Sequence, residues 1–211
     1  VGRFGDEIRA LTPEDLIPLP DSADLMYLPD RQALGVDEEG NILPLTGQAV
    51  SAILPAGYTR TLLPGFQLME EASQLPLYGY TAVAVYQDQL YAAAIYTDEN
   101  HKWEPENYNT PDLKKLVKRV KKDLPNNPLV EHLANCSLEW HCCTAENLFY
   151  RRWECGIPTS PVCNANCFGC ISLQPAECCP SPQERIKFRP TPEQIAEIGL
   201  YHLQTAPEGI I

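Results

Sequence analysis

Cysteine is absent from the first 135 residues of this 211-residue chain, and all nine cysteines lie between Cys136 and Cys179. This distribution excludes a disulfide framework that runs through the whole chain. The odd number of cysteines and two adjacent pairs, Cys142-Cys143 and Cys178-Cys179, fit a metal site in a reducing compartment better than a secreted scaffold. We therefore expect a cytoplasmic location.

Long hydrophobic runs and positive charge are also scarce. No apolar run reaches the roughly 18 residues that a membrane span needs, and no signal-peptide pattern opens the sequence. Residues 1–110 carry 17 acidic against 5 basic side chains, and the net charge of the chain is −12. The charge balance argues against a general nucleic-acid partner, and the lack of a long apolar run argues against a membrane. The missing initiator methionine and the apolar end at Ile210-Ile211 suggest a piece of a longer protein.

The N-terminal part predicts an acidic, β-containing domain. Residues 12–15 carry a helix-start signal for a single turn, and residues 37–40 form the acidic turn of a short hairpin. Residues 44–76 contain four prolines and predict irregular chain. The alternating pattern over 78–97 predicts an antiparallel hairpin. Five tyrosines in that hairpin could form a ligand platform, but we assign them to the core: Tyr78, Tyr80, Tyr86, Tyr91 and Tyr96.

Residues 111–155 predict a helical connector. Thr110 is a candidate N-cap for a first helix, whose apolar face comprises Leu113, Leu116, Val117, Val120 and Leu124. Its other face carries six basic residues, which favour a solvated surface over a docking surface for an acidic partner. A second helix places Cys136 on a buried stripe with Leu129, Leu133 and Trp140, and a third begins at Thr144.

The last segment has the order of a βαβ unit. A short strand at 157–162 precedes the cysteines, and Ile210-Ile211 starts another strand. Between them a helix over 192–204 begins at a capping box formed by Thr191 and Gln194, and its apolar face includes Ile195, Ile198 and Leu203. We expect the two strands to lie parallel in one sheet. The cysteine loop would then open at the carboxyl end of that sheet, where α/β proteins place their chemistry.

Three thiols stand close together in Cys163-x3-Cys167-x2-Cys170. Such a loop can hold three irons of a [4Fe-4S] cluster and leave the fourth iron open. A structural zinc would instead need a fourth protein ligand. Cys155, Cys178 and Cys179 could each supply it, so spacing alone leaves both metals open.

The motif in this position, at the mouth of a strand and followed by a helix and a second strand, resembles the signature of the radical S-adenosylmethionine (radical SAM) enzymes over about the last 55 residues. The resemblance implies a [4Fe-4S] cluster and S-adenosylmethionine as cofactors, with Cys163, Cys167 and Cys170 as the cluster ligands. It further implies that S-adenosylmethionine binds the open iron and is reductively cleaved to a 5′-deoxyadenosyl radical, which abstracts hydrogen from a substrate.

The resemblance also assigns a role to the residues before the last cysteine. Family members usually have an aromatic residue at the position of Gly169, and here Phe168 stands one place earlier. The backbone of Phe168 and Gly169 is therefore expected to lie near the adenine of S-adenosylmethionine. The resemblance implies a reductant such as a flavodoxin or ferredoxin, and it leaves the small-molecule or peptide substrate unidentified.

We therefore predict an α+β chain: an acidic domain over 1–110, a helical connector over 111–155 and, over 156–211, the first βα unit of a partial TIM-type (βα)6 radical SAM barrel with the cluster loop. This part of the enzyme is expected to be inactive by itself. The alternative is a non-catalytic zinc or iron-sulfur module with a structural or electron-transfer role.

Overall fold

A computed structural model describes residues 1–76, 78–167, 170, 172–173 and 183–211. The chain divides into two compact units, Val1–Glu104 and Pro105–Ile211, hereafter the N-terminal and C-terminal units. The described residues form an α+β fold with antiparallel sheets and four α-helices, which confirms the predicted class at this level. Each helix in the described ranges is too short or too polar to cross a membrane.

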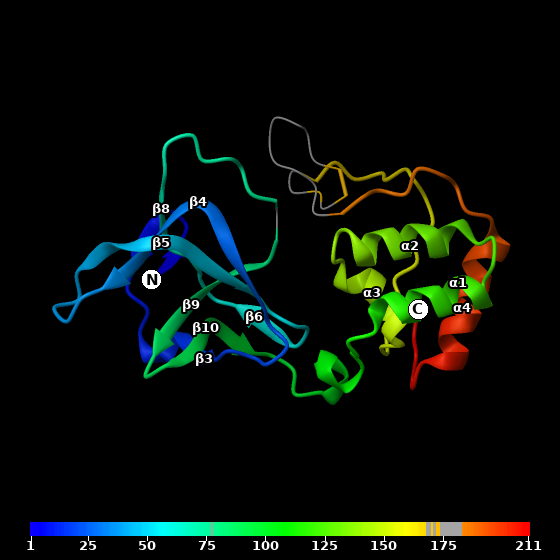
Figure 1. Ribbon diagram of the computed structural model, residues 1–211, viewed down its shortest axis with the longest axis horizontal. Coiled ribbons are helices and arrows are strands. Elements are labelled where there is room, and N and C mark those ends of the chain that lie inside the picture. Colours follow the sequence, from blue (N-terminus) through cyan, green and yellow to red (C-terminus); the bar gives the residue numbers. More distant parts are fainter. Residues whose placement is uncertain (77, 168–169, 171, 174–182) are drawn as a thin grey trace. The chain divides into compact units, whose positions relative to one another are not determined.

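The N-terminal unit is built from antiparallel strands (Figure 1). A small sheet has the order β2-β1-β7, and a larger one has the order β3-β10-β9-β5-β4-β8, with β6 paired to β10. The strands are β1 (Gly2–Phe4), β2 (Glu7–Arg9), β3 (Leu16–Pro18), β4 (Asp24–Val36), β5 (Ile42–Ile53), β6 (Tyr58–Arg60), β7 (Leu63–Pro64), β8 (Phe66–Leu68), β9 (Tyr80–Tyr86) and β10 (Gln89–Tyr96). The larger sheet has two end strands, so it is not a closed barrel.

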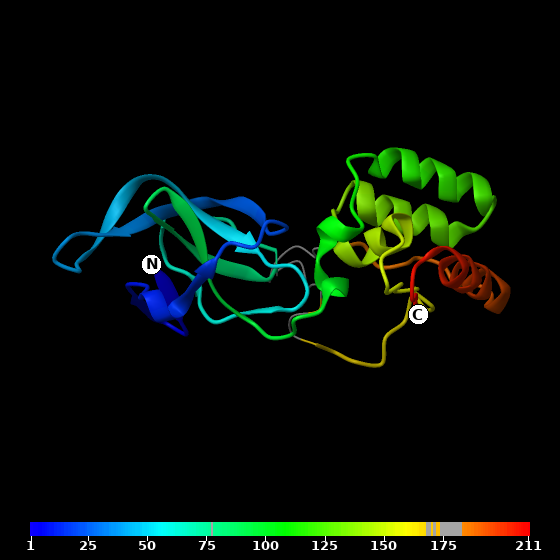
Figure 2. The same ribbon diagram turned by 90° about the horizontal axis from the view of Figure 1, so that it is seen from below.

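The longest hairpin joins β4 and β5 and extends beyond the neighbouring strands (Figure 2). Its predicted acidic turn is confirmed, because the Asp37 carboxylate accepts hydrogen bonds from the backbone N–H groups of Glu39 and Asn41 at 3.0 and 2.8 Å. The prediction of irregular chain after Pro44 is wrong, because β5 continues to Ile53. Register shifts in β4 interrupt the regular ladder, and such irregular pairing tolerates prolines.

The hairpin predicted at 78–97 is confirmed as β9 and β10, which turn at Gln87 and Asp88 with φ of 49° and 60°. Assigning its tyrosines to the core is wrong. Alanines fill the buried positions instead, with Ala82 and Ala93 0% exposed, whereas Tyr86 is 62% exposed. Small side chains let neighbouring chain pack closely on these strands, and the other four tyrosines are only half-buried.

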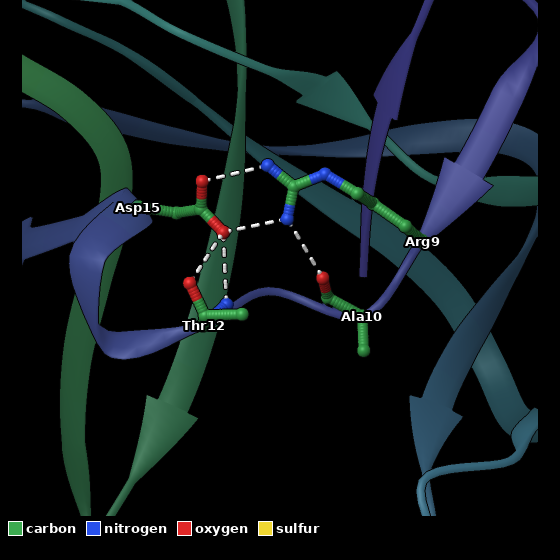
Figure 3. Close-up of polar contacts among 4 residues, drawn as sticks. All are labelled: Arg9, Ala10, Thr12 and Asp15. Atoms are coloured by element: carbon green, nitrogen blue, oxygen red, sulfur yellow. Dashed lines mark hydrogen bonds and ion pairs between the residues drawn. The ribbon is translucent and has the colours of Figure 1, made fainter.

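The single helical turn predicted at 12–15 is confirmed as the 3-10 helix η1 (Pro13–Asp15). Figure 3 shows the hydrogen bonds that Arg9 makes to this turn. Two guanidinium nitrogens donate to the two Asp15 carboxylate oxygens, each at 2.7 Å, and one of these nitrogens also donates to the carbonyl of Ala10. The Asp15 carboxylate accepts two more bonds from Thr12. The hydrogen bonds from Arg9 hold the pKa of Asp15 well below its usual range.

The C-terminal unit contains the helices α1 (Leu113–Asp123), α2 (Pro128–Leu138), α3 (Cys143–Tyr150) and α4 (Pro192–Thr205), after the short 3-10 helix η3 (Pro105–Asn107). The 3-10 helix η2 (His101–Trp103) closes the N-terminal unit. All four α-helices contribute to one core, whose buried members include Val117, Val120, Leu129, Leu133, Leu148, Phe149 and Ile198. The predicted connector and the segment after it therefore pack in one unit.

The helix predictions hold for most of the residues on their buried stripes, but they fail for Trp140 and Leu203 and at several helix ends. The N-cap position of α1 is Asp112 and not Thr110, its side chain makes no capping hydrogen bond, and Trp140 lies beyond the end of α2. In α4 the capping box between Thr191 and Gln194 is confirmed. Leu203, placed on the apolar face of α4, is 48% exposed, and its neighbour His202 is 0% exposed.

The strand predicted at 157–162 is wrong, because these residues form no strand. A parallel pairing does occur, but it lies slightly earlier in the chain. Glu154 and Ile210 form an isolated parallel bridge, in which the Ile210 N–H donates to the Trp153 carbonyl at 2.6 Å and the Cys155 N–H donates to the Ile210 carbonyl at 3.1 Å. The described residues thus contain a parallel crossover with α4 inside it, and this single bridge is not a TIM-type barrel.

Candidate metal centre

The cysteine loop, residues 163–170, lies between the two segments that the parallel bridge brings together. The chain leaves the bridge at Cys155, passes through the loop, forms α4 and returns to the bridge at Ile210. Within the loop, the side chains of Cys163 and Cys167 are exposed and Cys170 is half-buried. The backbone N–H of Ala165 lies 3.4 Å from the sulfur of Cys163.

Local sequence explains why the chain returns to the bridge. Thr191 and Gln194 cap α4 reciprocally, with the Thr191 N–H donating to Oε1 of Gln194 at 2.9 Å and the Gln194 N–H donating to Oγ1 of Thr191 at 3.3 Å. Gly199 lets the returning chain cross the helix closely, since a Cβ at this position would lie 2.7 Å from Cδ1 of Ile211. The helix is therefore fixed at its start and covered near its end by the segment that pairs with Glu154.

Several polar groups lie near the sulfur of Cys170, the third loop cysteine. Its pKa is lowered by a hydrogen bond from the backbone N–H of Ser172, by another from that of Leu173 and by the Arg185 guanidinium. Nη2 of Arg185 lies 3.5 Å from the sulfur. These groups favour the thiolate, which is the form that binds a metal.

The remaining described cysteines differ from the loop. Cys136 and Cys155 are buried, and burial raises the pKa of their thiols to about 11 and about 12. The predicted core position of Cys136 is confirmed. Both thiols stay protonated near neutral pH in the metal-free protein. Cys142 is half-buried and Cys143 is exposed.

The donor chemistry of the loop suits a thiophilic metal. Cys163, Cys167 and Cys170 are not in disulfides, two are exposed, and the third has surroundings that favour the thiolate. In the part of the chain that the structure describes, no group of three or more His, Cys, Asp or Glu side chains is arranged to hold a metal ion. The three-thiol ligand set therefore stays a prediction. Phe168 and Gly169, predicted to lie near the adenine, and the possible fourth ligands Cys178 and Cys179 lie outside the described residues.

Sequence reasoning missed three residues around this region. Arg185 contacts Cys170 from 15 positions further along the chain, so no local spacing could have indicated it. Gln183 donates to Oγ of Ser172 at 2.9 Å. His202 is buried beneath the bridge, where Gly209 packs against its ring. Only the position of His202 beside the apolar residues of a predicted helix offered a signal.

The N-terminal unit holds a separate hollow of about 1270 Å³. Its walls are mainly apolar side chains of β4, β5 and β9, including Leu25, Leu34, Leu45, Val50 and Val85. Two of the five hairpin tyrosines, Tyr86 and Tyr91, also line it. The hollow offers an apolar binding surface, and Asp37 is the only carboxylate among its lining residues in the described chain.

No family model matches this chain, and no curated protein or solved structure is significantly similar to it.

Proposed function

We propose that the C-terminal unit binds a [4Fe-4S] cluster through Cys163, Cys167 and Cys170 and belongs to a radical SAM enzyme. The observation that carries the proposal is the order of elements around the loop. Paired chain at Glu154, the three thiols, the capped helix α4 and paired chain at Ile210 follow one another as in the first crossover of an α/β enzyme. In such crossovers the loop after the first strand is where chemistry is placed.

The number of thiols favours a cluster with one open position. Three cysteines can ligate three of four irons, and the fourth iron is then available to the amino and carboxylate groups of S-adenosylmethionine. When bound, the cluster would supply one-electron reduction of S-adenosylmethionine, the chemistry by which radical SAM enzymes initiate hydrogen abstraction. The residues of this chain contribute the thiolates, and the surroundings of Cys170 favour that form before metal arrives.

The proposal also assigns the partners. A protein reductant such as a flavodoxin or ferredoxin would deliver the electron, and the substrate would bind outside the cluster loop. The backbone of Phe168 and Gly169 would lie against the adenine, as the family resemblance implies.

A structural zinc site is the second candidate. It is supported by the scarcity of regular structure between α3 and α4, where the described residues form no helix or extended strand. A closed zinc site would need a fourth ligand, for which Cys155, Cys178 and Cys179 are the nearest cysteines. Cys155 is buried, so its sulfur is less accessible to a metal than the exposed sulfurs of Cys163 and Cys167.

Metal analysis after anaerobic reconstitution distinguishes the two candidates. We expect about four irons per chain and a broad charge-transfer absorbance, which replacing Cys163, Cys167 or Cys170 by Ala abolishes. Replacing Cys155, Cys178 or Cys179 should leave the cluster intact. A colourless protein with one zinc per chain, which is lost when one of these latter three cysteines is replaced, would overturn the cluster proposal in favour of zinc.

A further inference from the structure

Residues 183–186 connect the cysteine loop to the helical core. Ile186 is 4% exposed and belongs to the core that α1 to α4 form, which fixes the backbone beside it. The three side chains that precede Ile186 contact other segments of the C-terminal unit. Arg185 contacts Cys170, Glu184 accepts from Nδ2 of Asn135 on α2 at 3.2 Å, and Gln183 contacts Ser172.

Gln183 forms two bonds in opposite directions. Its Oε1 accepts from the thiol of Cys142, the residue that precedes α3, at 3.3 Å. Its Nε2 donates to Oγ of Ser172 at 2.9 Å. A single amide side chain thus links the start of α3 to the residue two positions after the last loop cysteine, and this arrangement uses both its donor and its acceptor.

Arg185 supplies the charged contact of this connection. Its side chain is half-buried, and Nη2 lies 3.5 Å from the sulfur of Cys170. A guanidinium can donate to a sulfur while keeping other donors available, and its positive charge offsets the negative charge that thiolates bring to a cluster. Hydrogen bonds to the cluster sulfurs and positive charge near them raise the reduction potential of a cluster.

We propose that Arg185 is a positioning residue that holds Cys170 in place as the third cluster ligand, with Gln183 tying the same stretch to α3. This inference rests on the proposed cluster function. Arg185 would have two separable effects: its hydrogen bond holds the sulfur of Cys170, and with it the backbone N–H groups of Ser172 and Leu173, before metal binds, and its charge would raise the reduction potential of the bound cluster.

Substitutions at Arg185 separate these effects. Arg185→Gln removes the positive charge and the guanidinium donors. Arg185→Lys keeps a positive charge but lacks the planar guanidinium group. Arg189→Gln is the matched control, because it removes an equal charge from an exposed residue four positions further along. Thermal unfolding of each variant shows whether the C-terminal unit remains folded.

The first measurement uses metal-free protein. Amide exchange at Ser172 and Leu173 should be several-fold faster in Arg185→Gln than in the wild type, and unchanged in Arg189→Gln. The second measurement uses reconstituted protein. Arg185→Gln should bind less iron per chain, and the cluster that forms should have a lower midpoint potential, while Arg185→Lys should restore most of the potential.

The outcomes separate this inference from the function on which it rests. If wild-type protein binds iron as a cluster but Arg185→Gln matches it in exchange, iron content and potential, the positioning role is wrong and the cluster function stands. An equal loss in Arg189→Gln would likewise contradict the role, because the effect would then be one of overall charge. If the wild type forms no cluster, the proposed function is wrong, and the positioning role of Arg185 at a cluster ligand is wrong with it.

Discussion

Cys136 belongs to the helical core, and we expect it to lie outside the proposed metal site. Its side chain is 4% exposed, and its sulfur lies 3.6 Å from Nε2 of His132 on the same helix. Cys136→Ala leaves a small void, so we expect a loss of about 1 kcal/mol in the free energy of unfolding, measured by urea denaturation, and no change in metal content. The exposed Cys143→Ala is the control and should change neither. Loss of metal from Cys136→Ala would make Cys136 a ligand.

His202 should make the C-terminal unit sensitive to acid. Burial lowers its pKa, so the folded state keeps the imidazole neutral while the unfolded chain takes up a proton at its ordinary pKa of about 6.5. The stability that depends on the neutral ring is therefore present above about pH 6.5 and is lost as the pH falls through that value toward the folded pKa.

Urea unfolding between about pH 7.5 and about pH 5.5 tests this effect. The free energy of unfolding should decrease toward the acidic end in the wild type and decrease less in His202→Gln. His132 is half-buried, and burial also lowers its pKa, so His132→Gln is the matched comparison. An unaltered pH dependence in His202→Gln would show that His202 does not cause the sensitivity.

At the scale of single residues, helical spacing was enough to predict Cys136 in the core. It was not enough for α4, where the buried position is His202 and not Leu203. The chain that returns over the helix covers Gly199 and packs Gly209 against the imidazole, which selects the buried face. Spacing within one helix contains no information about that crossing. The contact between Arg185 and Cys170 was equally inaccessible, since it depends on how distant segments pack.

Asn127 joins two helices at their first turns. Its Oδ1 accepts from the Leu129 N–H at 3.0 Å and caps α2, while its Nδ2 donates to the Gln194 carbonyl at 3.0 Å and to a Glu197 carboxylate oxygen at 2.7 Å in α4. The residue is 3% exposed. Asn127→Ala should therefore cost about 2 to 3 kcal/mol of stability in urea denaturation, because both a cap and buried hydrogen bonds are lost.

The control for Asn127 is a cap without the link between helices. Thr191→Ala removes the N-cap side chain of α4 alone and should cost about 1 kcal/mol. If Asn127→Ala is no more destabilising than Thr191→Ala, the bonds to α4 contribute nothing measurable.

At the scale of elements, the sequence predicted those whose pattern is complete within a short window. The hairpin at 78–97 alternates on its own, and α4 contains its own start signal. The prediction failed for β5, because whether proline is tolerated depends on irregular pairing with a partner strand. It also failed at 157–162, because the only parallel bridge in the described C-terminal unit forms at Glu154.

At the scale of the whole molecule, the N-terminal unit should fold without metal. Strands β9 and β10 pair with each other and with β3, β5 and β6, all within Val1–Glu104. Amide exchange on metal-free protein should therefore show both strands protected, and adding iron should not change their rates. An unprotected hairpin alongside a protected cysteine region would reverse this assignment.

The organisation of the whole chain was predictable only in outline. Composition and periodicity indicated an acidic β-rich part followed by helices, and the clustering of cysteine at one end located the candidate site. They did not indicate that α1, α2 and α3 share a core with α4, since that depends on packing between distant segments. The spacing of the cysteines does not identify the metal either, because three thiols suit both a cluster with an open iron and an incomplete zinc site.

Electron paramagnetic resonance of the reduced full-length protein, with and without S-adenosylmethionine, tests the central claim most directly. If Cys163, Cys167 and Cys170 hold a [4Fe-4S] cluster with one open iron, reduction gives a paramagnetic cluster whose signal changes when S-adenosylmethionine occupies that iron. A Cys167→Ala protein, which lacks one ligand, should show no such signal. A cluster signal that S-adenosylmethionine leaves unaltered at saturating concentration, or a protein that forms no cluster, would contradict the account.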